Sequence, residues 1–255
     1  MRFLKLLLVV VMGMLLGLSA VAQAALVAYY PFDGDAIDWS GNGHDGVATG
    51  VTYTATDAKF GQMAVFNQAA GITLPITSDF NFGTADCSFA LWVKESNQAN
   101  DDVWIEKTVG TADGFTIRNQ AGAGVTVAVD DGILTNSTMP TKYGPQGSLY
   151  PFDTLHHVVV TLDSSAAGVK LYIDGALKIN TGGWAWVGRN INNTAAMTIG
   201  FSTNAGSFNR RLFGAIDDLA IYNTALTQTA ITAMQTAPAS TQIGPTPVSN
   251  WVIYE

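Results

Sequence analysis

The chain has 255 residues, of which 48% are hydrophobic and 13% charged, with 26 glycines and a formal net charge of -8. A chain of this length and composition can bury a substantial core. Its negative charge disfavours nucleic acid and anionic membrane surfaces as partners, because their phosphate groups repel it. The single cysteine, Cys87, cannot form an internal disulfide, and its alternation with Phe89 and Leu91 predicts a buried structural thiol.

The first two dozen residues have the layout of an export signal. Two basic residues precede an apolar stretch from Leu6 to Leu18, and Ala22 and Ala24 then fit a cleavage site. The apolar stretch is short for a membrane anchor. The sequence therefore predicts that residues 1–24 are a signal peptide, and that the mature protein is secreted, extracellular or periplasmic, with no stable membrane span.

The rest of the chain is predicted to form short strands separated by turns. Runs of β-branched and aromatic residues alternate with clusters of Gly, Asn, Asp, Pro and Ser, and helical periodicity is almost absent. Asp174-Gly175 between two such runs indicates a tight hairpin, because glycine tolerates a positive φ. This spacing favours a β-sandwich over an α/β fold. Strands are expected at Leu26–Phe32, Gln62–Asn67, Cys87–Lys94, Trp104–Val109, Phe115–Asn119, Val125–Val129, Leu155–Leu162, Val169–Ile173, Ala195–Phe201 and Leu212–Tyr222.

One short helix is predicted near the C-terminus, with Thr227 capping its first turn. Three apolar side chains can share its inner face: Leu226, Ile231 and Met234. Residues 237–255 are predicted as a tail whose first part is rich in Pro, Thr and Ser. Its apolar end, residues 251–254, either docks on the same sandwich or adds a strand to a neighbouring copy, and the second alternative implies self-association.

Three segments carry a combined pattern in this order. They are residues 30–46 (YPFDGDAIDWSGNGHDG), residues 155–175 (LHHVVVTLDSSAAGVKLYIDG) and residues 213–226 (FGAIDDLAIYNTAL). Together they resemble the laminin G-like, concanavalin A-like jelly-roll domains of the lectin/glucanase superfamily in secreted bacterial proteins, although Leu155 stands where a tryptophan is usual. The resemblance implies an all-β fold of two antiparallel sheets in a jelly-roll sandwich, over residues 25–236. It implies little about activity, because this fold carries lectins, glycosidases, adhesion modules and spacers.

The acidic loop of the first segment is the best candidate for a metal site. Calcium prefers oxygen ligands from carboxylates, amides and backbone carbonyls, and glycines let a loop turn its carbonyls inward. Similar domains often hold calcium between this loop and the Ile-Asp-Asp strand, whose Asp217 alternates with Leu219 and Ile221 and is therefore expected to point inward. The alternative is that these residues only cap turns. The candidate ligands of a structural calcium ion are Asp33, Asp35, Asp38, Gly41, Asn42, Gly43 and Asp217.

Two tryptophans form a candidate ligand platform. Trp184 and Trp186 flank Ala185, so both rings emerge on one side of an extended segment. Such rings could stack on sugar rings, while Arg189 and Asn192 bond hydroxyl groups. The alternative is that one ring fills the core and the other covers a loop.

Catalytic interpretations find little support in the residues. Glycosidases of this architecture place two carboxylates a few residues apart on one strand. The chain has three glutamates, Glu95, Glu106 and Glu255, on separate elements. The adjacent pairs Asp217-Asp218 and His156-His157 are expected to face opposite sides of their strands. No Gly-x-Ser-x-Gly elbow occurs.

The sequence therefore predicts a secreted, non-catalytic binding module, stabilised by calcium, which recognises an extracellular glycan or protein surface. A second hypothesis, from another class, is a structural or assembly subunit of an extracellular layer, sheath or filament. A glycosidase is the third and weakest.

Overall fold

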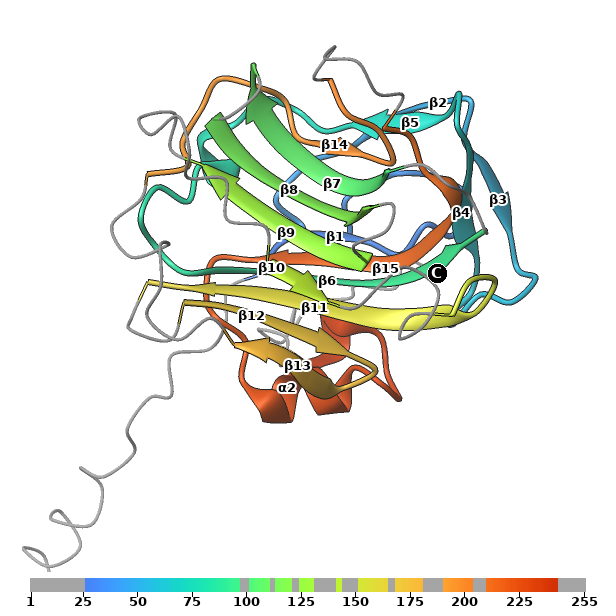
Figure 1. Ribbon diagram of the computed structural model, residues 1–255. Coiled ribbons are helices and arrows are strands. Elements are labelled where there is room, and N and C mark those ends of the chain that lie inside the picture. Colours follow the sequence, from blue (N-terminus) through green and yellow to red (C-terminus); the bar gives the residue numbers. More distant parts are fainter. Residues whose placement is uncertain are drawn as a thin grey trace, which may run out of the picture.

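The computed structural model describes residues 26–96, 101–110, 113–120, 124–130, 141–143, 151–164, 168–180, 190–203 and 210–242. These residues form two antiparallel sheets packed face to face, with one short helix outside them (Figure 1), so the predicted all-β sandwich is confirmed. The predicted signal peptide and the apolar end of the tail lie outside the described residues. None of the helices in the described part of the chain is long and apolar enough to cross a membrane.

The first sheet has eight strands. Seven follow the order β13-β12-β11-β6-β15-β4-β3, and β1 also pairs with β15. Their bounds are β1 Leu26–Tyr30, β3 Thr52–Thr54, β4 Met63–Asn67, β6 Cys87–Glu95, β11 Leu155–Asp163, β12 Gly168–Ile173, β13 Ala176–Asn180 and β15 Phe213–Tyr222. The β12–β13 hairpin turns through Asp174 and Gly175, both at positive φ, which confirms the predicted tight turn.

The second sheet has seven strands in the order β10-β9-β8-β7-β14-β5-β2. Their bounds are β2 Val47–Thr49, β5 Gly71–Thr73, β7 Asp102–Val109, β8 Asp113–Gln120, β9 Gly124–Asp130, β10 Thr141–Tyr143 and β14 Thr198–Ile199. The pattern of residues did not predict β2, β3, β5 and β10. The predicted hairpin implied β13 but gave it no bounds, and the strand predicted at Ala195–Phe201 is longer than the observed β14. Most of these strands are only two or three residues long, which is too short to show a two-residue period.

The core between the sheets is built from alternate residues of the long central strands. On β6, Phe89, Leu91 and Val93 point inward, and they meet Trp104 and Phe115 of the second sheet. The predicted buried thiol of Cys87 lies in the same cluster, and burial raises the pKa of that thiol. Apolar burial on this scale is the main stabilising contribution to a fold without a disulfide in its described part.

A second apolar cluster covers part of the outer face of the eight-stranded sheet (Figure 1). The predicted helix is α2, Gln228–Ala233, and Thr227 caps it as expected by accepting the Ala230 N–H. The described residues also form two short 3₁₀ turns, η1 at Ser78–Phe80 and η2 at Ala239–Gln242. Ala239 is buried in the outer cluster. Packing against the outer face of the sheet therefore extends to Ala239.

A β-bulge in β15 reverses the expected direction of Asp217. Asp217 lies opposite Trp92, whereas Ala220 lies opposite Ala90, so β15 holds one extra residue. That residue is Asp218, with φ 51°. Directly opposed residues share a face of the sheet, so Asp217 lies on the outer face. The predicted inward direction of Asp217 is wrong, because the bulge breaks the alternation with Leu219.

We expect Ile231→Ala to lower the free energy of unfolding by about 3 kcal/mol, the usual cost of truncating a fully buried isoleucine. Ile231 is the buried residue of α2 and packs into the outer cluster. Denaturant unfolding measures the change, with the exposed Thr229→Ala in the same helix as the control. Equal stability of the two variants would show that the helix is not anchored on the sheet.

Candidate functional site

The outer face of the eight-stranded sheet is divided into three zones along its strands. The outer apolar cluster with α2 and η2 covers one end. Residues 55–62, between β3 and β4, reach over the middle, where Lys59 lies above Trp92. The other end carries an open pocket. The three zones differ in chemistry.

The middle zone packs a cation, an indole and an imidazole together. Lys59 Nζ lies 4.4 Å from the centre of the Trp92 ring, whose other neighbour is the His157 ring at 4.9 Å. Trp92 is therefore buried, on the outer face of the sheet. His157 Nδ1 is hydrogen-bonded to the amide of Gln235. Burial, reinforced by the charge of Lys59, lowers the pKa of His157 to about 4, so this ring is a neutral packing element.

The neighbouring histidine serves the β12–β13 hairpin. His156 Nδ1 lies 2.8 Å from Asp174 Oδ2, and the N–H of His157 donates to Asp174 Oδ1 at 3.0 Å. The carboxylate therefore ties β11 to the hairpin turn. These contacts account for both histidines as structural residues.

We expect the stability of the wild type to fall relative to His157→Gln as the pH drops from about 6.5 towards 4. The unfolded chain binds a proton on His157 in this range and the folded chain does not, so the folded state loses free energy as the pH falls. The pKa of His157 is about 6.5 in the unfolded chain and about 4 in the folded one, and this difference corresponds to about 3 kcal/mol of unfolding free energy. Denaturant unfolding at several pH values measures it, and parallel profiles of the two proteins would contradict it.

Most of the predicted metal-binding loop is accounted for by internal hydrogen bonds. Asp38 is buried, and its carboxylate accepts the backbone N–H groups of Tyr29, Ser40 and His44 at 2.8–3.0 Å. Asp35 accepts the N–H of Ile37, and the Asn42 amide donates to carbonyls of β1. The predicted glycines do take a positive φ, at 88° for Gly41 and 77° for Gly43. Asp38 and Asn42 thus act as turn residues that fasten the loop to β1.

Two of the predicted ligands, Asp33 and Asp217, accept hydrogen bonds from the same loop. Asp33 Oδ1 accepts the N–H of Gln62 at 2.6 Å, and Asp217 Oδ2 accepts those of Lys59 and Phe60. Gly61 makes this possible: its φ is 54°, and a Cβ there would lie 1.9 Å from Asp33 Oδ1. The two aspartates and residues 59–62 therefore form one connected unit.

One oxygen of that unit has no partner. Asp217 Oδ1 is buried and accepts no hydrogen bond from the described residues. Burial raises the pKa of Asp217 to about 7, and the charges of Asp218 and Asp33 add to the effect. The described residues contain no group of three or more His, Cys, Asp or Glu side chains arranged to hold a metal. A cation here would therefore need backbone carbonyls or water as further ligands.

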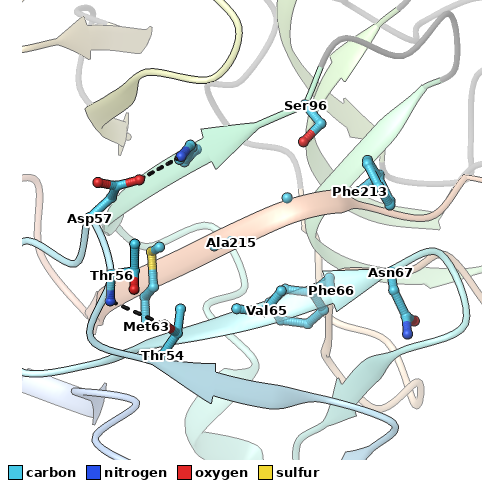
Figure 2. A pocket seen from close by; sticks show the side chains of 12 residues that line it. Thr54, Thr56, Asp57, Met63, Val65, Phe66, Asn67, Ser96, Phe213 and Ala215 are labelled. Atoms are coloured by element: carbon cyan, nitrogen blue, oxygen red, sulfur yellow. Dashed lines mark hydrogen bonds and ion pairs between the residues drawn. The ribbon is translucent and has the colours of Figure 1, made fainter.

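The open end of the sheet carries a pocket of about 310 Å³ (Figure 2). Its floor is apolar, with Val65 and Ala215 paired across β4 and β15. Figure 2 shows Asp57, Thr56 and Met63 at one end and Ser96, Phe213 and Asn67 at the other. The lining consists of Thr54, Thr56, Asp57, Met63, Val65, Phe66, Asn67, Lys94, Ser96, Phe213, Gly214 and Ala215.

The polar groups of the pocket are partly fixed in place. Lys94 Nζ forms an ion pair with Asp57 Oδ2 at 2.9 Å, across the pocket end (Figure 2). Asn67 Oδ1 accepts the N–H of Ala69 at 3.1 Å, which fixes its amide. Phe213 is 36% exposed at the opposite end. An apolar floor with a few oriented polar groups is typical of small-ligand sites.

None of the sequence-predicted ligand residues that the structure describes lines this pocket. Trp184, Trp186 and Arg189 lie outside the described residues, so the aromatic platform stays a prediction. Asn192 is exposed, and its Oδ1 accepts the N–H of Gly83, away from the pocket lining. Trp39 in the first loop is an exposed tryptophan, 64% accessible, which no sequence pattern marked as a ligand residue.

The fold and its strand order define a jelly-roll sandwich. The chain belongs to the concanavalin A-like lectin/glucanases superfamily, whose family model matches residues 66–232. The resemblance seen in the sequence is thus confirmed. A comparison with curated protein sequences finds no match.

Several solved structures share the fold. Domain 4 of AbnA, a GH43 extracellular arabinanase from Geobacillus stearothermophilus determined with arabinotriose, is 23% identical, with a TM-score of 0.61 over 84% of this chain and 99% of that domain. The binding domain of Paraclostridial Mosquitocidal Protein 1 is 17% identical, with a TM-score of 0.67 over 83% of this chain and 52% of its own. The binding domain of Botulinum neurotoxin DC, determined with rat synaptotagmin II, is 14% identical, with a TM-score of 0.63 over 83% and 51%. The chain thus spans about half the length of the two toxin domains.

Proposed function

We propose that this protein is a secreted, non-catalytic carbohydrate-binding domain, and that a sugar unit binds in the pocket at the open end of the eight-stranded sheet. The pocket itself is the observation that carries the proposal, because it combines an exposed aromatic ring with oriented polar groups. The likeness to a domain determined with arabinotriose supports the same ligand class. Export rests on the predicted signal peptide of residues 1–24.

The chemistry of the pocket suits the two faces of a sugar ring. The C–H face of a pyranose or furanose can stack on Phe213, as apolar ligand faces do on aromatic rings. Hydroxyl groups can then donate to Asp57 and accept from Lys94, which already hold each other in place. Preorganised polar groups lose little conformational freedom on binding.

The composition of the pocket supports binding without catalysis. Hydrolysis of a glycosidic bond generally needs two carboxyl groups on either side of the bond. Asp57 is the single acidic residue among those that line the pocket, and it is paired with Lys94. No second carboxyl group of the lining is in position to act with it.

Phe213→Ala should weaken binding of the preferred glycan about tenfold, since the loss of one stacking contact corresponds to roughly 1.4 kcal/mol. A glycan array identifies the ligand, and titration calorimetry measures the affinity. Ile76→Ala is the matched control, because Ile76 is an exposed apolar residue that does not line the pocket. Unchanged affinity of the Phe213 variant would exclude this pocket, and the absence of any glycan ligand would contradict the proposed function.

We further propose that a structural calcium ion binds between the first loop and β15. The unpartnered Asp217 Oδ1 supports this, because a buried carboxylate oxygen without a donor is destabilising unless a cation balances it. Asp33, which holds the same segment 59–62, is the second carboxylate ligand in reach, and backbone carbonyls would supply the rest. The ion would fix residues 55–62 over the middle zone of the sheet.

Calcium is expected to raise the melting temperature by several degrees, since a hundredfold excess over the Kd stabilises a native state by about 2.7 kcal/mol. Melting in millimolar calcium and in chelator measures the shift. Asp217→Asn should reduce it, whereas Asp45→Asn, in the same loop but bonded only to the N–H of Asp38 in the described part, should leave it unchanged. Identical melting curves with and without calcium would rule out the proposed ion.

A further inference from the structure

A second set of oxygen-bearing side chains lies between the two sheets, far along β6 from the outer apolar cluster. Glu95 is the last residue of β6, and Asp102 is the first residue of β7. Asn119, near the end of β8, is the third member of this interior cluster. All three side chains belong to residues with 0% exposure. The cluster therefore sits at the end of the sandwich where the chain passes from one sheet to the other.

Hydrogen bonds and strand register hold the three side chains together. The Glu95 carboxylate accepts the indole N–H of Trp104 through one oxygen and the amide N–H of Asn119 through the other. Asp102 lies directly opposite Asn119 in the β7–β8 ladder, so their side chains share the inner face. Glu95 of the eight-stranded sheet is thus bonded to two residues of the seven-stranded sheet.

Three oxygens of the interior cluster lack a hydrogen-bond donor. Neither carboxylate oxygen of Asp102 nor Oδ1 of Asn119 accepts a hydrogen bond of normal geometry from the described residues. The backbone N–H of Phe213 is the donor that interacts weakly with Asp102. No ion pair joins Glu95 or Asp102 to a basic side chain of the described residues.

Such an arrangement is costly unless something compensates it, because buried charges need partners and buried acceptors need donors. Burial, together with the charge of Asp102, raises the pKa of Glu95 to about 8. Burial, together with the charge of Asp101, raises the pKa of Asp102 to about 7. A proton on Asp102 would supply one donor for three unpartnered acceptors. A divalent cation can take several oxygen ligands and balance two carboxylates at once, and oxygen-only ligands suit calcium.

We propose that Glu95, Asp102 and Asn119 form a buried binding site for a divalent cation of the calcium type, which joins the two sheets at this end of the sandwich. The site is separate from Asp33 and Asp217, which lie on the outer face. It also does not depend on carbohydrate binding.

Terbium luminescence tests the proposal, because terbium replaces calcium at oxygen sites and emits when a nearby indole is excited. Trp104 donates to Glu95 and would therefore sensitise an ion in the interior cluster. Trp92 lies opposite Asp217 and would sensitise an ion at the outer site. The full chain carrying Asp217→Asn is therefore the starting protein, since it removes the outer contribution.

The Asp217→Asn protein is expected to keep terbium emission that calcium competes away, and to retain one calcium ion per chain by metal analysis after dialysis. Adding Asp102→Asn should abolish both the emission and the calcium-dependent rise in melting temperature. In chelator the double variant should melt at or above the temperature of the single variant, because an uncompensated buried charge has been removed. Glu95→Gln provides a second variant with the same expected loss of emission.

A different set of results would overturn the proposal. The Asp217→Asn protein would then show no terbium emission and no retained calcium. Its stability in chelator would fall as the pH rises from about 6 to 8, since the folded state would lose protons that the unfolded state does not hold in that range. If Asp102→Asn abolished this pH-dependent loss of stability, the interior cluster would hold a proton and not a cation. The metal analysis needs only the single variant, so poor folding of the double variant does not affect the outcome.

Discussion

Two adjacent carboxylates at the bulge of β15 hold three distant segments of the chain against the outer face of the eight-stranded sheet. Asp217 accepts the N–H groups of Lys59 and Phe60, which fastens the β3–β4 connection. Asp218 accepts the hydroxyl of Tyr29 on β1 and the N–H of Ala239 in η2. Burial raises the pKa of both groups, so the bonds are made at a cost in solvation. The bulge makes this possible, because it places consecutive side chains on one face.

The position of the pocket follows from what these carboxylates attach. The cluster with α2 covers one end of the outer face, and residues 55–62 cover the middle. Asp57 belongs to that same connection and pairs with Lys94 at the edge of the pocket. The pocket is thus the part of the sheet left open once the two covering segments are in place. The depth of the pocket and the place of the Asp57–Lys94 ion pair therefore depend on the hydrogen bonds that Asp217 accepts from Lys59 and Phe60.

Most long strands of this fold could be predicted because their inward and outward residues alternate over several positions, as β6 shows. Cys87–Lys94 read from the sequence as a strand with Phe89 and Leu91 inward, and both lie in the core. Trp92 shows the limit, because alternation gives two faces but does not say which segment covers the outer one. Its burial comes from Lys59 and His157, which are far away in the sequence.

The candidate sites could be predicted only in part, for two physical reasons. The direction of Asp217 was misjudged because a single residue in the left-handed conformation shifts the register, and an aspartate at that point gives little warning of it. The pocket escaped notice because its residues come from β3, β4, β6 and β15, and their side-by-side order is set by pairing across long connections. Local patterns carry no information on such pairing.

The end of the β6–β15 ladder joins the interior cluster to the pocket. Glu95 points into the sandwich, while Lys94 and Ser96 on either side of it line the pocket. In the β6–β15 ladder, Glu95 lies opposite Gly214. A Cβ at Gly214 would lie 2.2 Å from the carbonyl oxygen of Lys94, so the two strands approach closely here. Phe213 accepts the N–H of Ser96 through its carbonyl, and its own N–H interacts with Asp102. The ring that we assign to sugar stacking is therefore held by a backbone whose inner contact is a carboxylate of the interior cluster. The interior cluster and the proposed binding face therefore meet at Phe213, whose backbone N–H lowers the pKa of Asp102 while the residue itself lines the pocket.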